Sequence, residues 1–455
     1  MSSSARTPTG RRIGFVSTRF AGTDGVSLET AKWADVLEAM GHRCCYFSGL
    51  SNLPAEQSRV VPEAFWEHPQ VRVVQDAIFT ETRRPPAISR LIRELQQYLK
   101  EQLYAFVRDF EVDLLIVENA LAIPMNLPLG VALTEFISET LFPTIGHHHD
   151  FFWERKRFLS GCAWDYLNMC FPPQLPSIRH VVINSSGAHQ LSLRAGVSSL
   201  LIPNVMEFEA PPAPPDEYSQ TLRADLGLAP DEYMVLQPTR IVQRKGIEHA
   251  IELLHRLARL GLRCRLVISH AGGDEGDSYV RRVRDYAALL EVPLALVGDL
   301  VAPTRGTTPD GRKIYTLDDV YAQADLVTYP STMEGFGNAF LEAVYFRRPL
   351  VVNSYSIYAY DIRPKGFQVV EFDGFITDDT VEQVRALLER PAIGQQMAEH
   401  NYELGRRHYS FGVLQHSLEQ LIVGLFGVNP ARIPHEDAAT RAAEQRVMGS
   451  TAQSG

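Results

Sequence analysis

Residues 200–220, LLIPNVMEFEAPPAPPDEYSQ, divide the sequence into two halves that share one pattern. Five prolines fall between positions 203 and 215. Proline interrupts helices and sheets because its ring fixes φ and because it lacks a backbone N–H. This composition predicts a linker near residues 205–220. On both sides of it, short apolar runs alternate with longer amphipathic segments, as strands alternate with helices.

The half before the linker opens with a predicted strand–helix–strand unit. Ile13 to Ser17 form an apolar run, a helix is expected from about Ser27 to Met40, and Gly41 ends it. A second helix is expected over residues 86–110, where six large apolar side chains recur at helical spacing: Leu91, Ile92, Leu95, Leu99, Leu103 and Phe106. Further strands are expected within residues 112–120, 142–151 and 180–186.

The half after the linker repeats this alternation. Strands are expected within residues 233–240, 264–270, 293–299, 325–331 and 349–355, and helices within 246–261, 277–291 and 316–324. The pattern predicts the α/β class, with two facing Rossmann-like doubly wound domains and a cleft between them. The expected bounds are a disordered N-terminus at 1–11, a first domain at 12–205, a second domain at 206–407 and a loose tail at 428–455.

Composition excludes several classes of protein. The chain has 455 residues, 44 basic and 54 acidic, and a net charge of −10, so nucleic acid is not an expected partner. Five cysteines form no CxxC pair, which indicates a reducing cytoplasm. The polar start lacks the apolar core of a signal peptide, and no apolar run is long enough to span a bilayer. A membrane is therefore not an expected partner either.

Two stretches of the second half carry charge next to an expected strand end, where open α/β sheets bind ligands. In PTRIVQRKG, residues 238–246, the cations Arg240, Arg244 and Lys245 suit a phosphate or diphosphate, and a solvated basic turn is the alternative. In STMEGFGNAFLEA, residues 331–343, Glu334 and Glu342 are eight positions apart. That spacing places them on one face of a helix, with a glycine-rich turn after the first. Such a turn fits either an anion site or an ordinary capped helix.

Two stretches of the first half are also unusual. GTDGVS, residues 22–27, permits a tight turn through Gly22 and Gly25, although it does not match GxGxxG. GHHHDFFWERKRF, residues 146–158, has three consecutive histidines. Neighbours on an extended chain face alternate sides, so the three cannot all bind one ion, and one functional histidine is the preferred interpretation. The cations at 155–157 suit an anionic acceptor or form a solvated face.

Taken together, these motifs resemble the retaining glycosyltransferases of family 4, which have the GT-B fold. The resemblance covers residues 12 to about 425. Glu334 and Glu342 match the family's E-x7-E motif, and Arg240 and Lys245 match its R-x4-K phosphate site. IPNVMEFE is similar to its PNGVD hinge without the glycine, GTDGVS to its glycine loop, and HHHD to its HD motif, which makes His149 the match to the active-site histidine.

The resemblance implies roles for these residues. Arg240 and Lys245 would neutralise the leaving diphosphate, Glu334 would bind the transferred sugar, Glu342 the ribose, and His149 the sugar near the reacting carbon. His149, Glu334, Arg240 and Lys245 form the expected catalytic set. The expected donor contacts also include Gly25, Gly335, Phe336, Gly337, Asn338 and Glu342. No metal or other cofactor is expected, and a helix at about 408–427 would cross back to the acceptor-binding first domain.

The predicted function is therefore that of a retaining hexosyltransferase. Its donor would be an NDP-sugar of the UDP-glucose or GDP-mannose class, and its acceptor a small soluble molecule, an anionic one being favoured. Residues proposed to contact the acceptor are Arg19, Asp150, Arg155 and Arg157. The chain is similar to soluble glycoside synthases, such as those that make trehalose or mannosylglucosylglycerate, and a homodimer is compatible with the sequence.

Three alternatives stay open at this point. The first is a lipid- or polysaccharide-directed glycosyltransferase of the same fold. The second is a GT-B phosphorylase or epimerase. The third is a non-catalytic protein that binds sugar nucleotides, against which the intact charged motifs argue.

Overall fold

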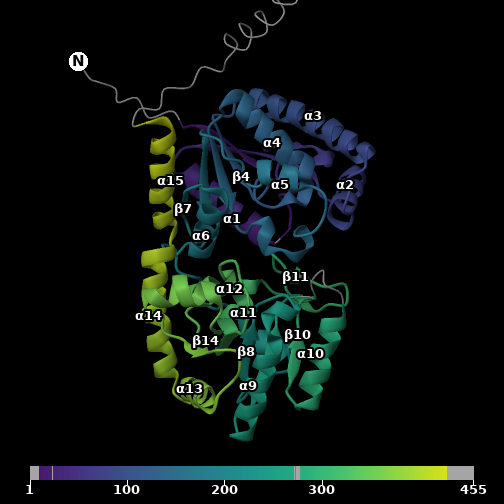
Figure 1. The fold of residues 1–455 in the computed structure, drawn as a ribbon. Helices are drawn as coiled ribbons and strands as arrows, with labels where there is room; N and C mark the ends of the chain where they lie inside the picture. Colours follow the sequence, from purple (N-terminus) through teal and green to yellow (C-terminus); the bar gives the residue numbers. More distant parts are fainter. Residues whose placement is uncertain (1–9, 23, 271, 273–276, 428–455) are drawn as a thin grey trace, which may run out of the picture. The chain divides into compact units, whose positions relative to one another are not determined.

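The computed structural model describes residues 10–22, 24–270, 272 and 277–427 (Figure 1). These residues form two compact units: the first runs up to Val181 and resumes at Gln415, and the second comprises Val182–Leu414. The predicted tail at 428–455 and nearly all of the predicted N-terminal segment at 1–11 lie outside the described residues. No helix in the described ranges is both long and apolar enough to cross a membrane.

The first sheet has, among the described residues, seven strands in the order β3-β2-β1-β4-β5-β6-β7. Strand β1 pairs in parallel with β2 and β4, β2 with β3, and β4 with β5. The strands are β1 (Arg12–Val16), β2 (Arg43–Ser48), β3 (Ser58–Val60), β4 (Leu114–Glu118), β5 (Thr144–His148), β6 (Ile178–Val182) and β7 (Ser199–Leu201). The parallel arrangement confirms the predicted Rossmann-like class.

Helices of the first unit cover this sheet. They are α1 (Gly25–Ala39), α2 (Pro69–Thr80), α3 (Pro86–Asp109), α4 (Leu127–Thr140) and α5 (Trp164–Cys170) (Figure 1). One core joins Phe47, Leu115 and Val117 of the strands to apolar side chains of α3 and α4, including Phe106 and Phe136. Helix α3 therefore buries five of the six apolar side chains that recur at helical spacing in residues 86–110, and Leu91 is half-buried.

The second sheet has strand order β10-β9-β8-β13-β14-β15, and all five pairings are parallel. Its strands are β8 (Tyr233–Gln237), β9 (Cys264–Ile268), β10 (Leu294–Leu296), β13 (Leu326–Tyr329), β14 (Leu350–Asn353) and β15 (Val370–Phe372). Alternate residues of β8 enter different cores: Met234 and Leu236 enter one, and Val235 the other. Both faces are thus buried, which explains why the strand is apolar along its length.

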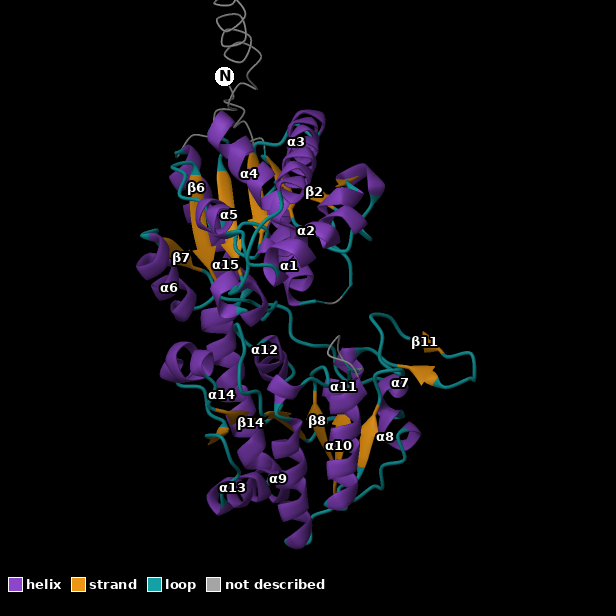
Figure 2. Cartoon of the chain, turned by 45° about the vertical axis from the view of Figure 1, so that its right-hand side comes forward, coloured by secondary structure: helices purple, strands orange, loops and turns teal. Residues whose placement is uncertain are grey.

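Helices cover both faces of this sheet (Figures 1 and 2). Ile251 and Leu254 of α9 share a core with Val235, whereas Tyr321 of α11 and Phe340 of α12 pack with Met234. The helices around this sheet are α7 (Glu217–Gln220), α8 (Leu222–Asp225), α9 (Ile247–Arg259), α10 (Asp277–Leu289), α11 (Leu317–Gln323), α12 (Asn338–Tyr345), α13 (Asp378–Glu389) and α14 (Pro391–Tyr409). Helix α6 (Ser185–Ala195) packs instead with β7 of the first sheet. In α15 (Phe411–Phe426), residues from Gln415 onward group with the first unit.

Hydrogen bonds attach the proline-rich segment to the second unit. The hydroxyl of Tyr402 donates to the carbonyl of Phe208 at 2.9 Å, and that of Tyr345 donates to the carbonyl of Ala210, also at 2.9 Å. Further along, Asp216 caps α7. A linker was predicted at 205–220 from its prolines, but long-range contacts order this segment.

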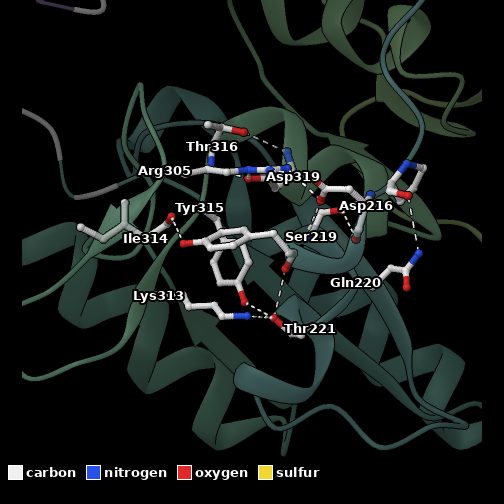
Figure 3. Close-up of polar contacts among 12 residues, drawn as sticks. Asp216, Ser219, Gln220, Thr221, Arg305, Lys313, Ile314, Tyr315, Thr316 and Asp319 are labelled. Carbon is white, nitrogen blue, oxygen red and sulfur yellow. Dashed lines mark hydrogen bonds and ion pairs between the residues drawn. The ribbon is translucent and has the colours of Figure 1, made fainter.

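A small antiparallel hairpin, β11 (Gly306–Thr307) and β12 (Lys313–Ile314), extends from the second unit (Figure 2). Figure 3 shows how it is fixed. The hydroxyl of Tyr218 lies 2.9 Å from the carbonyl oxygens of both Gly306 and Ile314. Arg305 bridges the carboxylates of Asp216 and Asp319. The hairpin was not predicted, and these contacts anchor it to the end of the segment predicted as a linker and to Asp319 of α11.

Candidate active site

The turn from β8 into α9 brings two cations against the loop that follows β13. Gly246, which ends this turn, has φ of +58°, and a Cβ atom added to it would lie 2.4 Å from the carbonyl oxygen of Pro330. Only glycine combines this conformation with so close an approach. The two loops are then joined by a backbone hydrogen bond from Thr332 N to Arg244 O, 2.9 Å long. The glycine therefore places Arg244 and Lys245 beside Glu334.

Glu334 forms ion pairs with both cations of that turn. Its carboxylate contacts Lys245 Nζ and lies 3.1 Å from Arg244 Nη1. The Glu334 and Lys245 side chains are only 9% and 10% exposed. Burial opposes the charge of Glu334, but Lys245 and Arg244 outweigh it and hold its pKa below the usual range. Burial lowers the pKa of Lys245, an effect that Glu334 partly offsets. The arrangement is that of an ionised carboxylate neutralising a buried ammonium.

Two further basic side chains lie at this edge of the second sheet, after β8 and after β9. Arg240 follows β8 and is exposed. His270 follows β9, and its pKa falls to about 4 because of burial and because Lys245 and Arg240 are near it. His270 was not among the predicted site residues, although it ends the apolar run at 264–270. Clustered cations at the carboxyl edge of parallel strands suit an anionic ligand.

The glycine-rich turn before α12 is also fixed by close contacts. Gly337 has φ of +124°, and a Cβ atom added to it would lie 2.4 Å from the Tyr355 hydroxyl oxygen. The same hydroxyl donates to the carbonyl of Phe336 at 3.0 Å. Gly337 is the N-cap of α12, and no side chain caps this helix start. The first backbone N–H groups of α12 therefore lack a side-chain acceptor, as an anion site requires.

Two asparagines that the sequence analysis missed hold this turn in place. Asn184 Nδ2 donates to the carbonyl of Gly335 at 2.6 Å, and Asn204 Nδ2 donates to Asn338 Oδ1 at 2.6 Å. Both asparagines are buried. They come from 134 and 151 residues earlier in the chain, so no local pattern reveals them.

Glu334 and Glu342 do not share a helix, contrary to the expectation from their spacing. Helix α12 begins at Asn338, so Glu334 lies in the preceding loop. Glu342 lies within the helix, where it accepts a hydrogen bond of 2.8 Å from the hydroxyl of buried Tyr321. Tyr321 thus fixes the carboxylate proposed to bind a ribose. Because of this turn, Glu334 lies in a loop and Glu342 in a helix, and both belong to the second unit.

In the first unit, the side chain of Asp24 caps the start of α1. Asp24 Oδ1 accepts hydrogen bonds of 3.2 Å from the N–H groups of Val26 and Ser27. Its Oδ2 contacts Arg19 Nη2 at 2.6 Å, and the Arg19 guanidinium lies over the Trp66 ring. Gly25 is the first residue of α1. A phosphate that used these N–H groups would have to displace Asp24, so the proposed donor contact at Gly25 requires a rearrangement.

The three consecutive histidines have three different environments. His148 is buried, and its Nε2 lies 2.8 Å from Nδ1 of His180. His147 is fully buried and stacks on Trp33, with ring centroids 4.1 Å apart. The side chain of His149 is 9% exposed. Of the three side chains, that of His149 is therefore the most exposed, and its contact with a ligand stays a prediction.

Glu118, at the end of β4, joins two of these histidines. Its carboxylate lies 2.9 Å from His147 Nδ1 and 3.0 Å from His149 Nε2. Burial opposes the charge of Glu118, but the two rings lower its pKa to about 2. Burial lowers the pKa of His149, yet Glu118 outweighs it and raises that pKa above the ordinary value. Glu118 was not among the predicted site residues, although an acid ending an apolar strand is a visible signal.

The same three residues could also be considered as metal ligands. Their nitrogen and oxygen atoms all lie within 4.8 Å of one another, and two histidines with a carboxylate are a known zinc set. The carboxylate, however, already accepts an N–H from each ring at ordinary hydrogen-bond distance. These hydrogen bonds satisfy the Glu118 carboxylate with protons that the two rings carry. They favour a hydrogen-bonded cluster over a metal site.

The residues proposed for the acceptor separate into three groups. Asp150 accepts from Asn119 Nδ2 at 3.0 Å and from Arg155 Nε at 2.5 Å, and Asn119 Oδ1 accepts from the backbone N–H of His149. Asp150 and Arg155 are thus linked to His149. Arg157 instead lies over the Phe158 ring. Arg19 is engaged with Asp24, as described above, and no described contact links it to Arg155.

Comparisons with known proteins agree with this architecture. Residues 312–404 match the family of glycosyl transferases group 1. Over 443 residues the chain is 30% identical to the mannosylglucosylglycerate synthase of Thermotoga maritima, covering 90% of this chain and 100% of that protein.

Similar solved structures include a glycosyltransferase from Rickettsia africae, with a TM-score of 0.66 and 11% identity over 91% of this chain and 98% of that one. Another is HepE of Anabaena in complex with UDP and glucose, with a TM-score of 0.61 and 15% identity over 91% of this chain and 100% of that one. These two likenesses show the fold. With the family match and the relative's identity along nearly the whole chain, they lead to one conclusion: the chain belongs to the group 1 glycosyltransferases, enzymes that transfer sugars, and has the GT-B fold of two Rossmann-like units.

Proposed function

We propose that the chain transfers a hexose from a nucleoside-diphosphate sugar to a hydroxyl of a small soluble acceptor, with retention of configuration. The observation that carries the proposal is the buried contact of Lys245 with Glu334 beside Arg240 and Arg244. Cations at the carboxyl edge of the second sheet stabilise the charge that develops on a departing diphosphate. Glu334 then accepts hydrogen bonds from sugar hydroxyls, and Glu342 from the ribose.

Donor binding in this proposal exchanges the partner of Lys245. Without donor, Glu334 neutralises the ammonium. A diphosphate contributes stronger negative charge, takes up Lys245 and Arg240, and accepts from the backbone N–H groups at the start of α12. The Glu334 carboxylate is thereby released toward the transferred sugar. The ion pair thus keeps the pocket electrically balanced until donor arrives.

The relatives support a mannose donor and an acidic acceptor. The name mannosylglucosylglycerate synthase describes a product that contains a mannosyl group, a glucosyl group and glycerate. By analogy, we propose a GDP-mannose-type donor and a glucosylated small acid as acceptor, with Arg155 beside His149 placed to meet the acid. UDP-glucose is the second donor to test, since the similar HepE structure contains UDP and glucose.

A thermal-shift panel tests the donor class. Purified protein is heated with UDP-, GDP-, ADP- and TDP-sugars, and one base is expected to raise the unfolding midpoint most. At a concentration of 100 times Kd, a ligand that binds only the folded state adds about 2.7 kcal/mol to the free energy of unfolding. Lys245→Ala should lose the shift, whereas Lys313→Ala, a control in the same unit, should keep it. An equal response to all four classes, or to none, contradicts the donor assignment.

Transfer is expected to proceed without a divalent metal, because Arg240, Arg244 and Lys245 supply the positive charge that a metal would otherwise provide. Treatment with EDTA, followed by passage through a desalting column, should change kcat by less than about twofold, a difference too small to represent lost charge stabilisation. The measurement is release of the nucleoside diphosphate. A large loss of rate that zinc or magnesium restores would contradict this prediction and direct attention to Glu118, His147 and His149.

A further inference from the structure

Within the described part of the chain, the Glu118 carboxylate makes side-chain hydrogen bonds to two histidine rings and to no other side chain. Strands β4 and β5 are in register so that Glu118 pairs with His147, and Glu118 is fully buried. Its two side-chain partners, His147 Nδ1 and His149 Nε2, lie at hydrogen-bond distance. A buried carboxylate is costly unless such partners satisfy it. The chain therefore holds a buried charge beside His149, the predicted active-site histidine, which begins the loop after β5.

These contacts determine which nitrogen of His149 can meet a ligand. An ionised carboxylate only accepts hydrogen bonds, so each ring must present an N–H to it. For a neutral His149 this selects the tautomer with the proton on Nε2. Nδ1 makes no hydrogen bond with any described residue, and the backbone N–H of the same residue is fixed by Asn119 Oδ1 at 2.8 Å. Nδ1 is the nitrogen left for a ligand.

His147 completes the carboxylate's set of partners without competing for that ligand. It is fully buried, stacked on Trp33, and its Nε2 has no hydrogen-bond partner within the described ranges. The charged groups that influence His149 are Glu118 from β4, Glu29 from α1 and the neighbouring Asp150. Glu29 is itself ion-paired with Lys32 at 3.1 Å. Among them, Glu118 is the one in direct contact with the ring.

We propose that Glu118 is a positioning residue: by accepting the Nε2–H of His149, it orients the ring so that Nδ1 is left to meet a sugar hydroxyl of the substrate. This inference rests on the proposed function of the site. Above the pKa of the imidazolium, the ring is neutral, and Nδ1 accepts a hydrogen bond from a sugar hydroxyl. Below it, Nδ1–H donates one. Glu118 moves this change to higher pH because it stabilises the imidazolium.

Glu118→Gln tests the proposal with little change of shape. A glutamine carries no charge and replaces one carboxylate oxygen with an NH2 donor, so its hold on the two ring N–H groups is weaker. We expect kcat to fall about 10- to 100-fold, as when an outer partner of a functional histidine is removed, with the donor KM changed by less than about threefold. Glu139→Gln, which alters an exposed ion pair with Lys100, should leave both constants unchanged. Wild-type kcat in Glu118→Gln would overturn the proposal.

Two further readouts separate positioning from a purely structural effect. The double variant with His149→Ala should be no slower than His149→Ala alone, since Glu118 acts through that ring. Fully additive losses would contradict the proposal. Imidazole ¹⁵N NMR should show Nε2–H on neutral His149, with a titration midpoint above 6.5 in the wild type and lower in Glu118→Gln. Nδ1–H on the neutral ring, or an unmoved midpoint, would also overturn it.

The NMR measurement keeps the inference separate from the proposed function. It needs no substrate, so the hold of Glu118 on His149 is decided even if the wild type transfers no sugar from any donor tested. That second result would contradict the proposed function alone. If Glu118→Gln fails to fold, the wild-type tautomer gives the decision, supported by Glu118→Asp, which keeps the charge but should lose the 3.0 Å contact and part of the rate.

Discussion

Replacing Lys245 with alanine is expected to lower kcat/KM by about 10²- to 10³-fold, the range found when one preorganised group that stabilises developing charge is removed. The ammonium is buried, and low dielectric surroundings strengthen its interaction with a diphosphate. Arg244 is more exposed than Lys245, so solvent screens its charge more and it cannot fully replace Lys245. Release of nucleoside diphosphate under steady-state conditions measures the effect.

The same substitution should also change the pH dependence of stability. Lys245 helps to hold the pKa of Glu334 below its usual value, so this carboxylate stabilises the fold above its unfolded pKa of about 4.3. That contribution is lost as pH falls through the lower, folded pKa. Without Lys245 the contribution shrinks, and the unfolding midpoint should drop at pH 7 more than at pH 3. Lys313→Ala is the matched control, and near wild-type kcat/KM for Lys245→Ala would contradict the assigned site.

Replacing Gly337 with alanine is expected to disorder the turn before α12 and to reduce transfer by at least about 10²-fold, through displacement of the groups that position the donor. The positive φ costs alanine about 1–3 kcal/mol, and the new Cβ atom would lie 2.4 Å from the Tyr355 hydroxyl oxygen. Tyr355 is buried and donates to Phe336, so it cannot move aside without losing that bond. Activity and the unfolding midpoint are measured together.

Gly374→Ala is the matched control for this prediction. Gly374 has φ of +74°, but a Cβ atom added there has no neighbour within 4 Å. The control therefore also has a positive φ, but in the left-handed region and without the collision. If Gly337→Ala and Gly374→Ala have the same small effect on transfer, the close packing of the turn is not needed for catalysis.

Much of the fold could be predicted because its strands are apolar and regularly spaced. The runs at 112–120 and 233–240 contain β4 and β8, and the periodic stretch at 86–110 contains α3. Helix α4 escaped prediction because nearly all its residues from Leu127 to Ile137 are buried, so it has no polar face to reveal its period. The β11–β12 hairpin escaped because it is fixed by Tyr218, which lies 88 residues before Gly306.

The candidate site was predictable where its residues are charged and close in sequence. Arg240, Lys245 and Glu334 were proposed from their motifs, and the structure brings Lys245 and Glu334 into contact. What sequence could not supply was the partner of each group. Glu118 meets His149 across 31 residues, and Asn184 meets Gly335 across 151. Spacing also failed for Glu334 and Glu342, because the turn at Gly337 delays the start of α12.

The central claim is that the chain moves a hexose from an NDP-sugar to a small acceptor with retention. The most direct measurement is ¹H NMR of a reaction that contains GDP-mannose or UDP-glucose and a glucosylated small acid. We expect a new anomeric signal with the donor's α configuration, appearing in step with released nucleoside diphosphate. A β-configured product, or a sugar signal that forms without nucleoside diphosphate, would contradict it.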